Sequence, residues 1–277
     1  MPEPITTVTL GAVGAYLAKD GVAKLLGPTA EYLGDGLQQL VEKRAKNLAR
    51  IFKSAENRLG EEISQPGQVP PRILKSVVNE GTFIDDNLAI EYYGGLLASS
   101  RTRSPDEDRG VVIAKSLETM SVYQIRAHYI FYSSIGRAYQ DKPVNLSTTE
   151  GRKASYTGLS FEGFCKAMGL VQDPNSPELR SIMEHIMFGL SRLDMIRSPF
   201  FYGTNEALSA KGFTLDEPKI MVAPSLAGAE LFIWGLGEGL SPPSRFNHTQ
   251  ILERVNTDDV AVVDAHPFDL PSQLNNG

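Results

Sequence analysis

One amphipathic segment constrains the fold of this chain more than any other feature. Over residues 29–59, a rotation of about 100° per residue gathers the large apolar side chains on one side of a helix. That side contains Leu37, Leu40, Val41, Ala45, Leu48, Ile51, Phe52, Ala55 and Leu59. Pro28 suits a first helical turn, and Gly60 suits the position just after a last one. The pattern therefore predicts one continuous helix with a buried side, in a mainly helical domain.

The opposite side of this helix carries a narrow stripe of Lys43, Lys46, Arg50 and Lys53. Arg44 is separate, because it projects from the middle of the apolar side. Residues 40–58 hold six basic and two acidic side chains, a local excess of four positive charges in a chain of net charge −6. The default interpretation of the stripe is an ordinary solvated helix side over a packed core. Its functional interpretation is a binding site for an anionic membrane surface or an anionic partner, with nucleic acid as the least expected ligand.

Residues 1–140 are predicted to form a multi-helix domain around this segment. The Gly- and Ala-rich stretch 5–26 favours a helix, but its apolar part, 5–18, is shorter than the roughly 20 residues that cross a bilayer. A helix is predicted to begin at Pro71, and another follows Asp85 and Asp86. The region 111–138 also has a helical pattern, with a break near Met120 and Ser121.

The polar, breaker-rich segment 141–158 is predicted to be a linker, and residues 159–240 a small second domain. There, Ser160 suits the N-cap of a helix over 161–168, and Pro177 opens a helix to about Met195. Two β-prone runs within 197–223 predict one short hairpin, and a last helix covers 226–235. This order predicts a winged-helix-like domain. Residues 241–277 are predicted to be an irregular C-terminal tail.

No familiar catalytic pattern occurs in the sequence. Cys165, the only cysteine, has Phe161, Phe164 and Met168 at helical spacing, so we expect a buried, unreactive thiol. His128 and His185 fall within predicted helices and lack the spacing of metal ligands. Ser160 is better explained as an N-cap than as a nucleophile, since no strand is predicted before it. We therefore predict no catalytic residue, no metal and no cofactor.

Charge argues against DNA recognition by the second domain. Residues 160–240 contain six Lys and Arg but ten Asp and Glu, a net charge of −4. Affinity for DNA comes largely from neutralising phosphates, so an acidic domain lacks that contribution. A winged-helix transcription regulator is therefore the alternative reading, and an enzyme with a dispersed site is a second alternative.

Several segments resemble the Abi-alpha family, bacterial proteins associated with abortive infection and phage defence. NLAIEYYGGLLASS at 87–100 resembles one family motif, and VVIAKSLETMSVYQIR at 111–126 is similar to the helices that follow it. GLSFEGFCKAMGL, HIMFGLSRLDMI and IMVAPSLAGAELFIWGLG are similar to the C-terminal module. The resemblance covers about residues 30–237 in order. Every matching position is a packing position, so no catalytic residue is implied. The Gly-rich end of the last helix and the long tail depart from the pattern.

The resemblance implies a non-enzymatic component of bacterial antiviral defence that acts through protein or membrane-surface contacts. The expected partner is another defence protein or a phage component, with an anionic membrane surface as an alternative and a second copy of the chain as a further candidate. Nucleic acid is the least expected partner. The N-terminus lacks the positive region of a secretory signal. The expected location is therefore the cytoplasm, with peripheral attachment at the inner membrane as the alternative.

Overall fold

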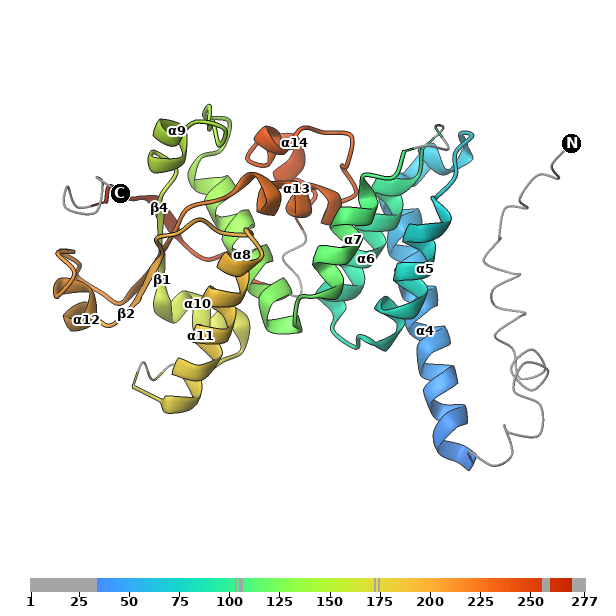
Figure 1. Cartoon of the computed structure of the whole chain (residues 1–277), viewed down its shortest axis with the longest axis horizontal. Helices are drawn as coiled ribbons and strands as arrows, with labels where there is room; N and C mark the ends of the chain where they lie inside the picture. Colours follow the sequence, from blue (N-terminus) through green and yellow to red (C-terminus); the bar gives the residue numbers. More distant parts are fainter. Residues whose placement is uncertain are drawn as a thin grey trace, which may run out of the picture. The chain divides into compact units, whose positions relative to one another are not determined.

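The computed structural model describes residues 34–102, 104, 107–171, 173, 175–255 and 260–270, with side chains from residue 42 onward. Helices dominate this part of the chain, and a small antiparallel sheet of four strands lies in the C-terminal half (Figure 1). Contacts divide the chain into two compact units, Met1–Glu118 and Thr119–Gly277. The predicted helix over 5–26 lies outside the described residues.

The first unit is helical in its described part. Its elements are α4 (Gly34–Leu59), the 3-10 turn η1 (Gly60–Ser64), α5 (Pro71–Asn79), the 3-10 turn η2 (Gly81–Phe83), α6 (Asn87–Ser100) and α7 (Gly110–Glu118). The long amphipathic helix is confirmed from residue 34 to residue 59, while 29–33 lie outside the described residues. Gly60 ends it with a φ of 52°, a backbone angle that glycine adopts without strain.

The apolar side of α4 packs against α6 and η2. Leu48, Ile51 and Ala55 are buried there, which confirms the predicted side over this range. Two polar side chains are buried among them. The Nδ2 atom of Asn47 donates to the carbonyl oxygen of Ile84 at 2.9 Å, and Ser54 donates to a carboxylate of α6 at 2.7 Å. Both therefore satisfy their hydrogen-bonding groups inside the helix–helix contact.

Local capping chemistry places the next helices where the sequence predicts them. Pro71 occupies the first turn of α5, and the Asp86 side chain accepts from the backbone N–H of Ala89 to cap α6. The predicted break near Met120 is confirmed, because α7 ends at Glu118 and α8 (Val122–Ala138) begins behind a Ser121–Gln124 capping box.

Helix α8 is the central helix of the second unit, where it contacts α10 (Phe161–Met168), α11 (Pro177–Arg192), α13 (Leu226–Gly235) and α14 (Thr249–Leu252) (Figure 1). A helix that is apolar on all sides must be covered on all sides. The side chains of Ile125, Ile130, Phe131 and Ile135 are all fully buried. The boundary between the two units therefore lies between Glu118 and Thr119, before the linker expected at 141–158. Helix α8 belongs to the second unit, whereas the sequence predicted it within a domain that ends at residue 140.

The sheet of the second unit has the strand order β2-β3-β1-β4, and all neighbours are antiparallel. Its strands are β1 (Thr157–Ser160), β2 (Phe201–Gly203), β3 (Lys219–Val222) and β4 (Ala265–Pro267). The predicted hairpin is present as β2 and β3, with Phe201 opposite Met221 and the short helix α12 (Asn205–Ser209) in its loop. Strand β1 pairs with β3, so that Thr157 lies opposite Val222.

Two predicted irregular regions contain regular structure. The segment 141–158 includes the short helix α9 (Thr149–Lys153) and the start of β1. The tail beyond residue 240 includes the 3-10 turn η3 (Pro243–Arg245), α14 and β4. Phe246, Ile251 and Val263 are buried. The expectation of an irregular tail was therefore wrong over these residues, since scattered apolar side chains of the tail complete the core around α8.

Candidate functional site

The structure gives three of the four side chains in the basic stripe of α4 a partner within the first unit. Lys43 forms an ion pair with Asp85, and Arg50 donates a hydrogen bond to Asn87. Lys53 pairs with Glu56, one turn further along α4, at 3.0 Å. Lys46 is exposed. The four residues thus lie on one helix side as predicted, but the fold brings acidic and amide groups from the start of α6 to the same surface.

Asp85 shows the electrostatic effect of this arrangement. The hydrogen bond from Lys43, helped by one from Asn47, lowers the pKa of the Asp85 carboxyl below its ordinary value. The side chains of Lys43 and Asp85 are 56% and 58% exposed, so solvent screens their attraction and the pair adds little stability. The negative charge of Asp85 nevertheless reduces the positive potential that a membrane or acidic partner would meet.

Arg44 belongs to the packed side of α4, as its position in the pattern predicts. Its Nε atom donates to the Thr82 hydroxyl at 3.1 Å, and its guanidinium lies 4.0 Å from the centre of the Phe83 ring. This cation–π contact and the hydrogen bond hold η2 against α4. Arg44 is therefore a structural residue and is not part of the exposed stripe.

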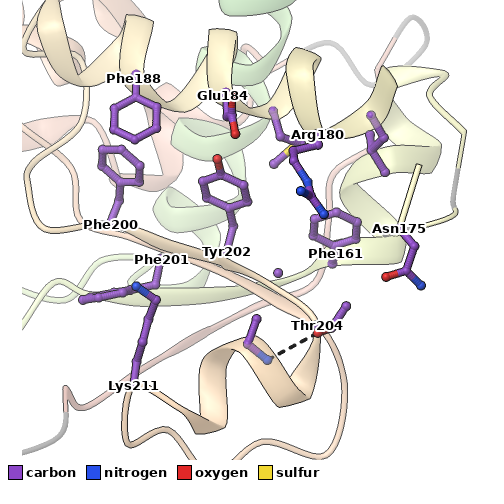
Figure 2. Close-up of a pocket in the computed structure, with 14 residues that line it drawn as sticks. Phe161, Asn175, Arg180, Glu184, Phe188, Phe200, Phe201, Tyr202, Thr204 and Lys211 are labelled. Atoms are coloured by element: carbon purple, nitrogen blue, oxygen red, sulfur yellow. Dashed lines mark hydrogen bonds between the residues drawn. The ribbon is translucent and has the colours of Figure 1, made fainter. Parts of the chain in front are cut away.

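A groove of about 480 Å³ lies between α11 and the β2–α12 segment of the second unit (Figure 2). Phe188 of α11 is 61% exposed and meets Phe200 edge-on, with ring centres 5.2 Å apart. Phe200 in turn stacks with Tyr202, with ring centres 6.4 Å apart. Figure 2 shows Phe188 and Glu184 pointing from α11 toward these two rings. Three aromatic side chains thus form a partly exposed surface along one groove, and we call them the aromatic cluster.

Charged side chains of both signs line the same groove. Arg180 and Glu184 extend from the exposed side of α11, and Lys211 follows α12. Burial and the Glu184 carboxylate raise the pKa of the Tyr202 hydroxyl, while Arg180 acts in the opposite direction. The groove therefore carries one more positive than negative charge within a net acidic segment, and it offers apolar surface together with two cationic side chains.

The aromatic cluster was missed in the sequence, although α11 carries a signal for it. Arg180, Glu184 and Phe188 follow one another at four-residue spacing, which places them on one side of a helix. The other side holds Leu179, Met183, Ile186, Met187 and Leu190, all buried. Phe188 is therefore a large apolar residue on the polar side of α11. Packing in the core of the protein does not explain a phenylalanine at this position.

Histidine and cysteine occupy structural positions in the second unit. Desolvation lowers the pKa of fully buried His128 to about 3, and its Nε2 atom lies 3.0 Å from the Gly228 carbonyl oxygen, to which the neutral ring donates. Burial raises the pKa of the Cys165 thiol to about 11, so the thiolate is scarce at neutral pH. The burial of Cys165 confirms the expectation for its thiol, and His128 is likewise a buried residue of the core.

Two serines have partial features of catalytic sites. Strand β1 ends at Ser160, so the expectation that no strand precedes this residue was wrong; its hydroxyl nevertheless accepts the backbone N–H of Gly163, which confirms the N-cap. The Ser121 hydroxyl lies 2.8 Å from Nε2 of His185, a contact that the sequence did not indicate. Ser121 also caps α8 by accepting from the backbone N–H of Gln124. The same hydroxyl therefore serves both as the N-cap of α8 and as a partner of His185.

In the ranges that the structure describes, no cluster of three or more His, Cys, Asp and Glu side chains could hold a metal ion. Over the same ranges, no helix has the length and apolar character needed to cross a membrane.

Comparison of the whole chain with family models, with curated proteins and with solved structures found no match.

Proposed function

We propose that this chain is a non-enzymatic interaction protein of bacterial antiviral defence, and that its second unit captures a partner segment in the groove between α11 and β2. The defence context is supported by the resemblance of residues 87–100 and the later segments to the Abi-alpha family. The mode of action is supported by one observation above others, the partly exposed aromatic cluster of Phe188, Phe200 and Tyr202 in that groove.

The order of elements supports a winged-helix-like second unit. Helix α8, strand β1, helices α10 and α11 and the β2–β3 hairpin occur in this order, with the short helix α9 between α8 and β1, and β1 pairs with the second strand of that hairpin. In such an arrangement α11 takes the position of the recognition helix, and the β2–β3 loop that of the wing. The aromatic groove lies between these two elements, so it occupies the surface with which winged helices commonly bind their targets.

The chemistry of the groove favours a protein segment over duplex DNA. Exposed aromatic side chains beside charged residues are typical of the positions that dominate protein–protein binding energy. The segment 160–240 has a net charge of −4, which disfavours a phosphate backbone. Arg180 and Lys211 complement an acidic residue, and the aromatic cluster complements a large apolar one. The proposed occupant is therefore an acidic peptide segment with one large apolar anchor.

The basic stripe of α4 supports a second candidate, attachment to an anionic membrane surface. Lys43, Lys46, Arg50 and Lys53 share one side of the helix, and each cation near such a surface contributes about 1 kcal/mol. Asp85 lowers the net charge of that surface by its ion pair with Lys43. The aromatic groove consequently has the stronger support.

The proposal is tested by placing a photo-crosslinking amino acid at position 188 in phage-infected cells. We expect one defined protein adduct, which Tyr202→Ser weakens by roughly tenfold or more because that ring forms part of the anchor site. The matched control carries the same crosslinker at position 240, since Leu240 is 84% exposed and does not line this groove. An adduct that forms equally from both positions, or that is insensitive to Tyr202→Ser, would contradict the proposed groove.

Phage challenge tests the defence context separately. Cells that express the chain should suppress plaque formation across part of a phage panel, and Phe188→Ser should abolish this protection while Leu240→Ser preserves it. If the two variants protect equally, the groove is not the effector surface. If the wild-type chain protects against no phage, the defence assignment is refuted, whereas the crosslinking result still decides whether the groove binds a protein.

A further inference from the structure

A second cleft of the same unit, of about 470 Å³, brings together basic side chains that are distant in sequence. Arg152 and Lys153 come from α9, while Arg197 follows the end of α11. Asp194 is the acidic residue among those that line it, so the cleft carries two more positive than negative charges. This concentration contrasts with the net charge of −6 of the whole chain and makes the cleft attractive to anions.

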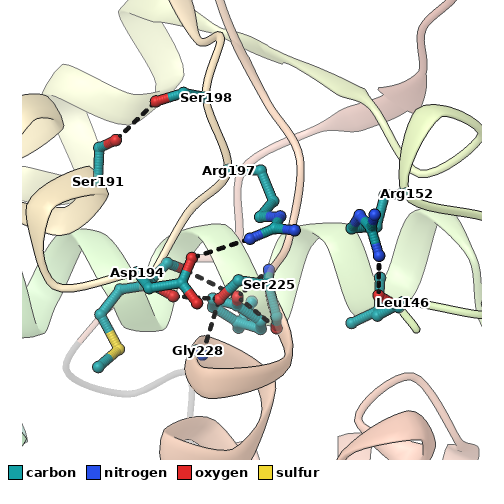
Figure 3. Close-up of polar contacts among 10 residues, drawn as sticks. Leu146, Arg152, Ser191, Asp194, Arg197, Ser198, Ser225 and Gly228 are labelled. Atoms are coloured by element: carbon teal, nitrogen blue, oxygen red, sulfur yellow. Dashed lines mark hydrogen bonds and ion pairs between the residues drawn. The ribbon is translucent and has the colours of Figure 1, made fainter. Parts of the chain in front are cut away.

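Hydrogen bonds within the protein position both guanidinium groups. Arg152 donates to the Leu146 carbonyl oxygen at 3.2 Å and to the Thr149 hydroxyl at 3.0 Å. Arg197 donates to the Asp194 carboxylate, also at 3.2 Å. Figure 3 shows the contact of Arg197 with Asp194 and that of Arg152 with Leu146. A guanidinium has five N–H donors, so these contacts orient each group without using all of its donors.

Hydroxyl and apolar groups complete the lining of the cleft. The Ser191 and Ser198 hydroxyls lie 2.9 Å apart (Figure 3), so that one of them donates to the other and the second keeps its hydrogen for a ligand, while Pro199 and Leu270 provide apolar surface. A bare phosphate ion would leave most of such a volume unfilled. The cleft falls within the range of small-molecule sites, roughly 300–1,000 Å³, so it suits a phosphoryl group that is joined to an organic part.

We infer that this cleft binds a soluble phosphorylated small molecule of about nucleotide size. Arg152, Arg197 and Lys153 receive the phosphoryl oxygens, because planar guanidinium donors match the geometry of a phosphate. The organic part packs on the apolar side of the cleft. This site is separate from the aromatic groove, because the two clefts share none of their lining residues. Binding of a ligand in this cleft therefore does not depend on the partner proposed for the aromatic groove.

Titration calorimetry on the full chain tests the inference with inorganic phosphate, pyrophosphate, AMP and ATP as probes. We expect AMP or ATP to bind more tightly than inorganic phosphate. Arg197→Gln and Arg152→Gln should each weaken that binding by roughly tenfold or more, since each removes charge-assisted hydrogen bonds to the phosphoryl group. Lys166→Gln is the matched control, because Lys166 is an exposed cation of the same unit and does not line the cleft. It should leave the affinity unchanged.

Circular dichroism of each variant separates loss of binding from loss of fold, and Lys153→Gln provides an independent substitution if Arg152→Gln unfolds. The inference is overturned if none of the four phosphates binds at millimolar concentration, or if binding is the same in the Arg variants and the wild type. Vesicles of phosphatidylglycerol and a duplex oligonucleotide serve as further arms. Arg197-dependent binding to either of these, without binding of a soluble phosphate, would also overturn the assignment to a small molecule.

Discussion

Ser54 of α4 and Gly94 of α6 bring the two longest described helices of the first unit into close contact. A Cβ atom added to Gly94 would lie 2.3 Å from the Ser54 hydroxyl oxygen and 3.1 Å from the Ile51 carbonyl oxygen, both too close for an unshifted structure. Gly94, the first glycine in the YYGG sequence of α6, is therefore required for packing, because the absence of a side chain there lets α4 approach.

Gly94→Ala should destabilise the first unit by about 1–3 kcal/mol, because the added methyl group overpacks the α4–α6 contact. Ser54→Gly removes the nearest obstructing atoms, so the double variant should be more stable than the two separate effects predict. Urea denaturation followed by circular dichroism measures the four free energies of unfolding. If the two changes in the free energy of unfolding add exactly, the Ser54 side chain does not limit how closely α4 approaches α6.

Leu48→Asp should unfold the first unit, since it places an unpaired charge at a position that is 4% exposed, and the cost exceeds about 3 kcal/mol. Ala49→Asp, one residue along the same helix but exposed, is the control and should behave like the wild type apart from a small propensity effect. Amide hydrogen exchange of α4 and α6 follows the change. Retention of wild-type protection by Leu48→Asp would contradict the assigned side of α4.

Lys43→Gln should raise the pKa of the Asp85 carboxyl toward its ordinary value, because the main hydrogen bond that favours the carboxylate is lost. The lowered pKa in the folded state means that the pair stabilises the fold at pH values above the pKa of the unfolded chain. This stabilisation disappears as the pH falls through the folded-state pKa. NMR titration of Asp85 measures the shift, and an identical titration curve in both proteins would show that Lys43 does not govern Asp85.

Replacing Lys43, Lys46, Arg50 and Lys53 together by Gln should leave the fold intact, because Gln is a good helix former. If the stripe contacts an anionic membrane, the variant should lose liposome binding by a factor on the order of 10³, from about 1 kcal/mol per cation. Sedimentation with anionic vesicles measures this at low and physiological salt. Equal sedimentation of variant and wild type would leave α4 with an ordinary solvated side.

His128 predicts a distinct acid sensitivity of the second unit. Its folded-state pKa of about 3 lies below that of an unfolded chain, near 6.5, so unfolding takes up a proton between these values. Stability should fall as the pH decreases below about 6.5, by up to about 1.4 kcal/mol per unit. His128→Phe should be less stable at pH 8, where it lacks the hydrogen bond to Gly228, but should lose less stability on acidification.

Fluorescence of buried Trp234 reports unfolding of this unit. Parallel pH profiles of the two proteins would exclude His128 as the cause.

Features that depend on neighbouring residues could be predicted from the sequence. Asp86, Ser160 and Ser225 each cap a helix by accepting a backbone N–H three residues ahead, a contact decided within one turn. The long range of α4 follows from its periodicity for the same reason. Strands β1 and β4 could not be found this way, because runs of four and three residues carry almost no periodic signal and exist only through pairing with distant segments.

The two clefts could not be predicted for the same reason, because each depends on contacts between segments that are distant in sequence. Phe188 was detectable in principle as an apolar residue on a polar helix side, but its meeting with Phe200 depends on how β2 lies against α11. Arg152 and Arg197 were not detectable as a pair, because only the fold of the second unit brings them to one cleft. The basic stripe was easy to find in the sequence, because its residues follow the helical period. Its pairing with Asp85 could not be predicted, because Asp85 lies outside α4 and reaches the stripe only in the fold.

The pairing of Gly158 with His266 has a consequence for how the chain is made. A ribosome must synthesise β4 before β1 can acquire its second neighbour, so the second unit cannot complete its sheet during most of its own translation. The described contacts of the first unit lie within residues 34–118, and that unit can therefore form while the rest is still being synthesised. Until β4 has been synthesised, one edge of β1 is open to pairing with another chain, and its length of four residues limits the surface that this edge offers.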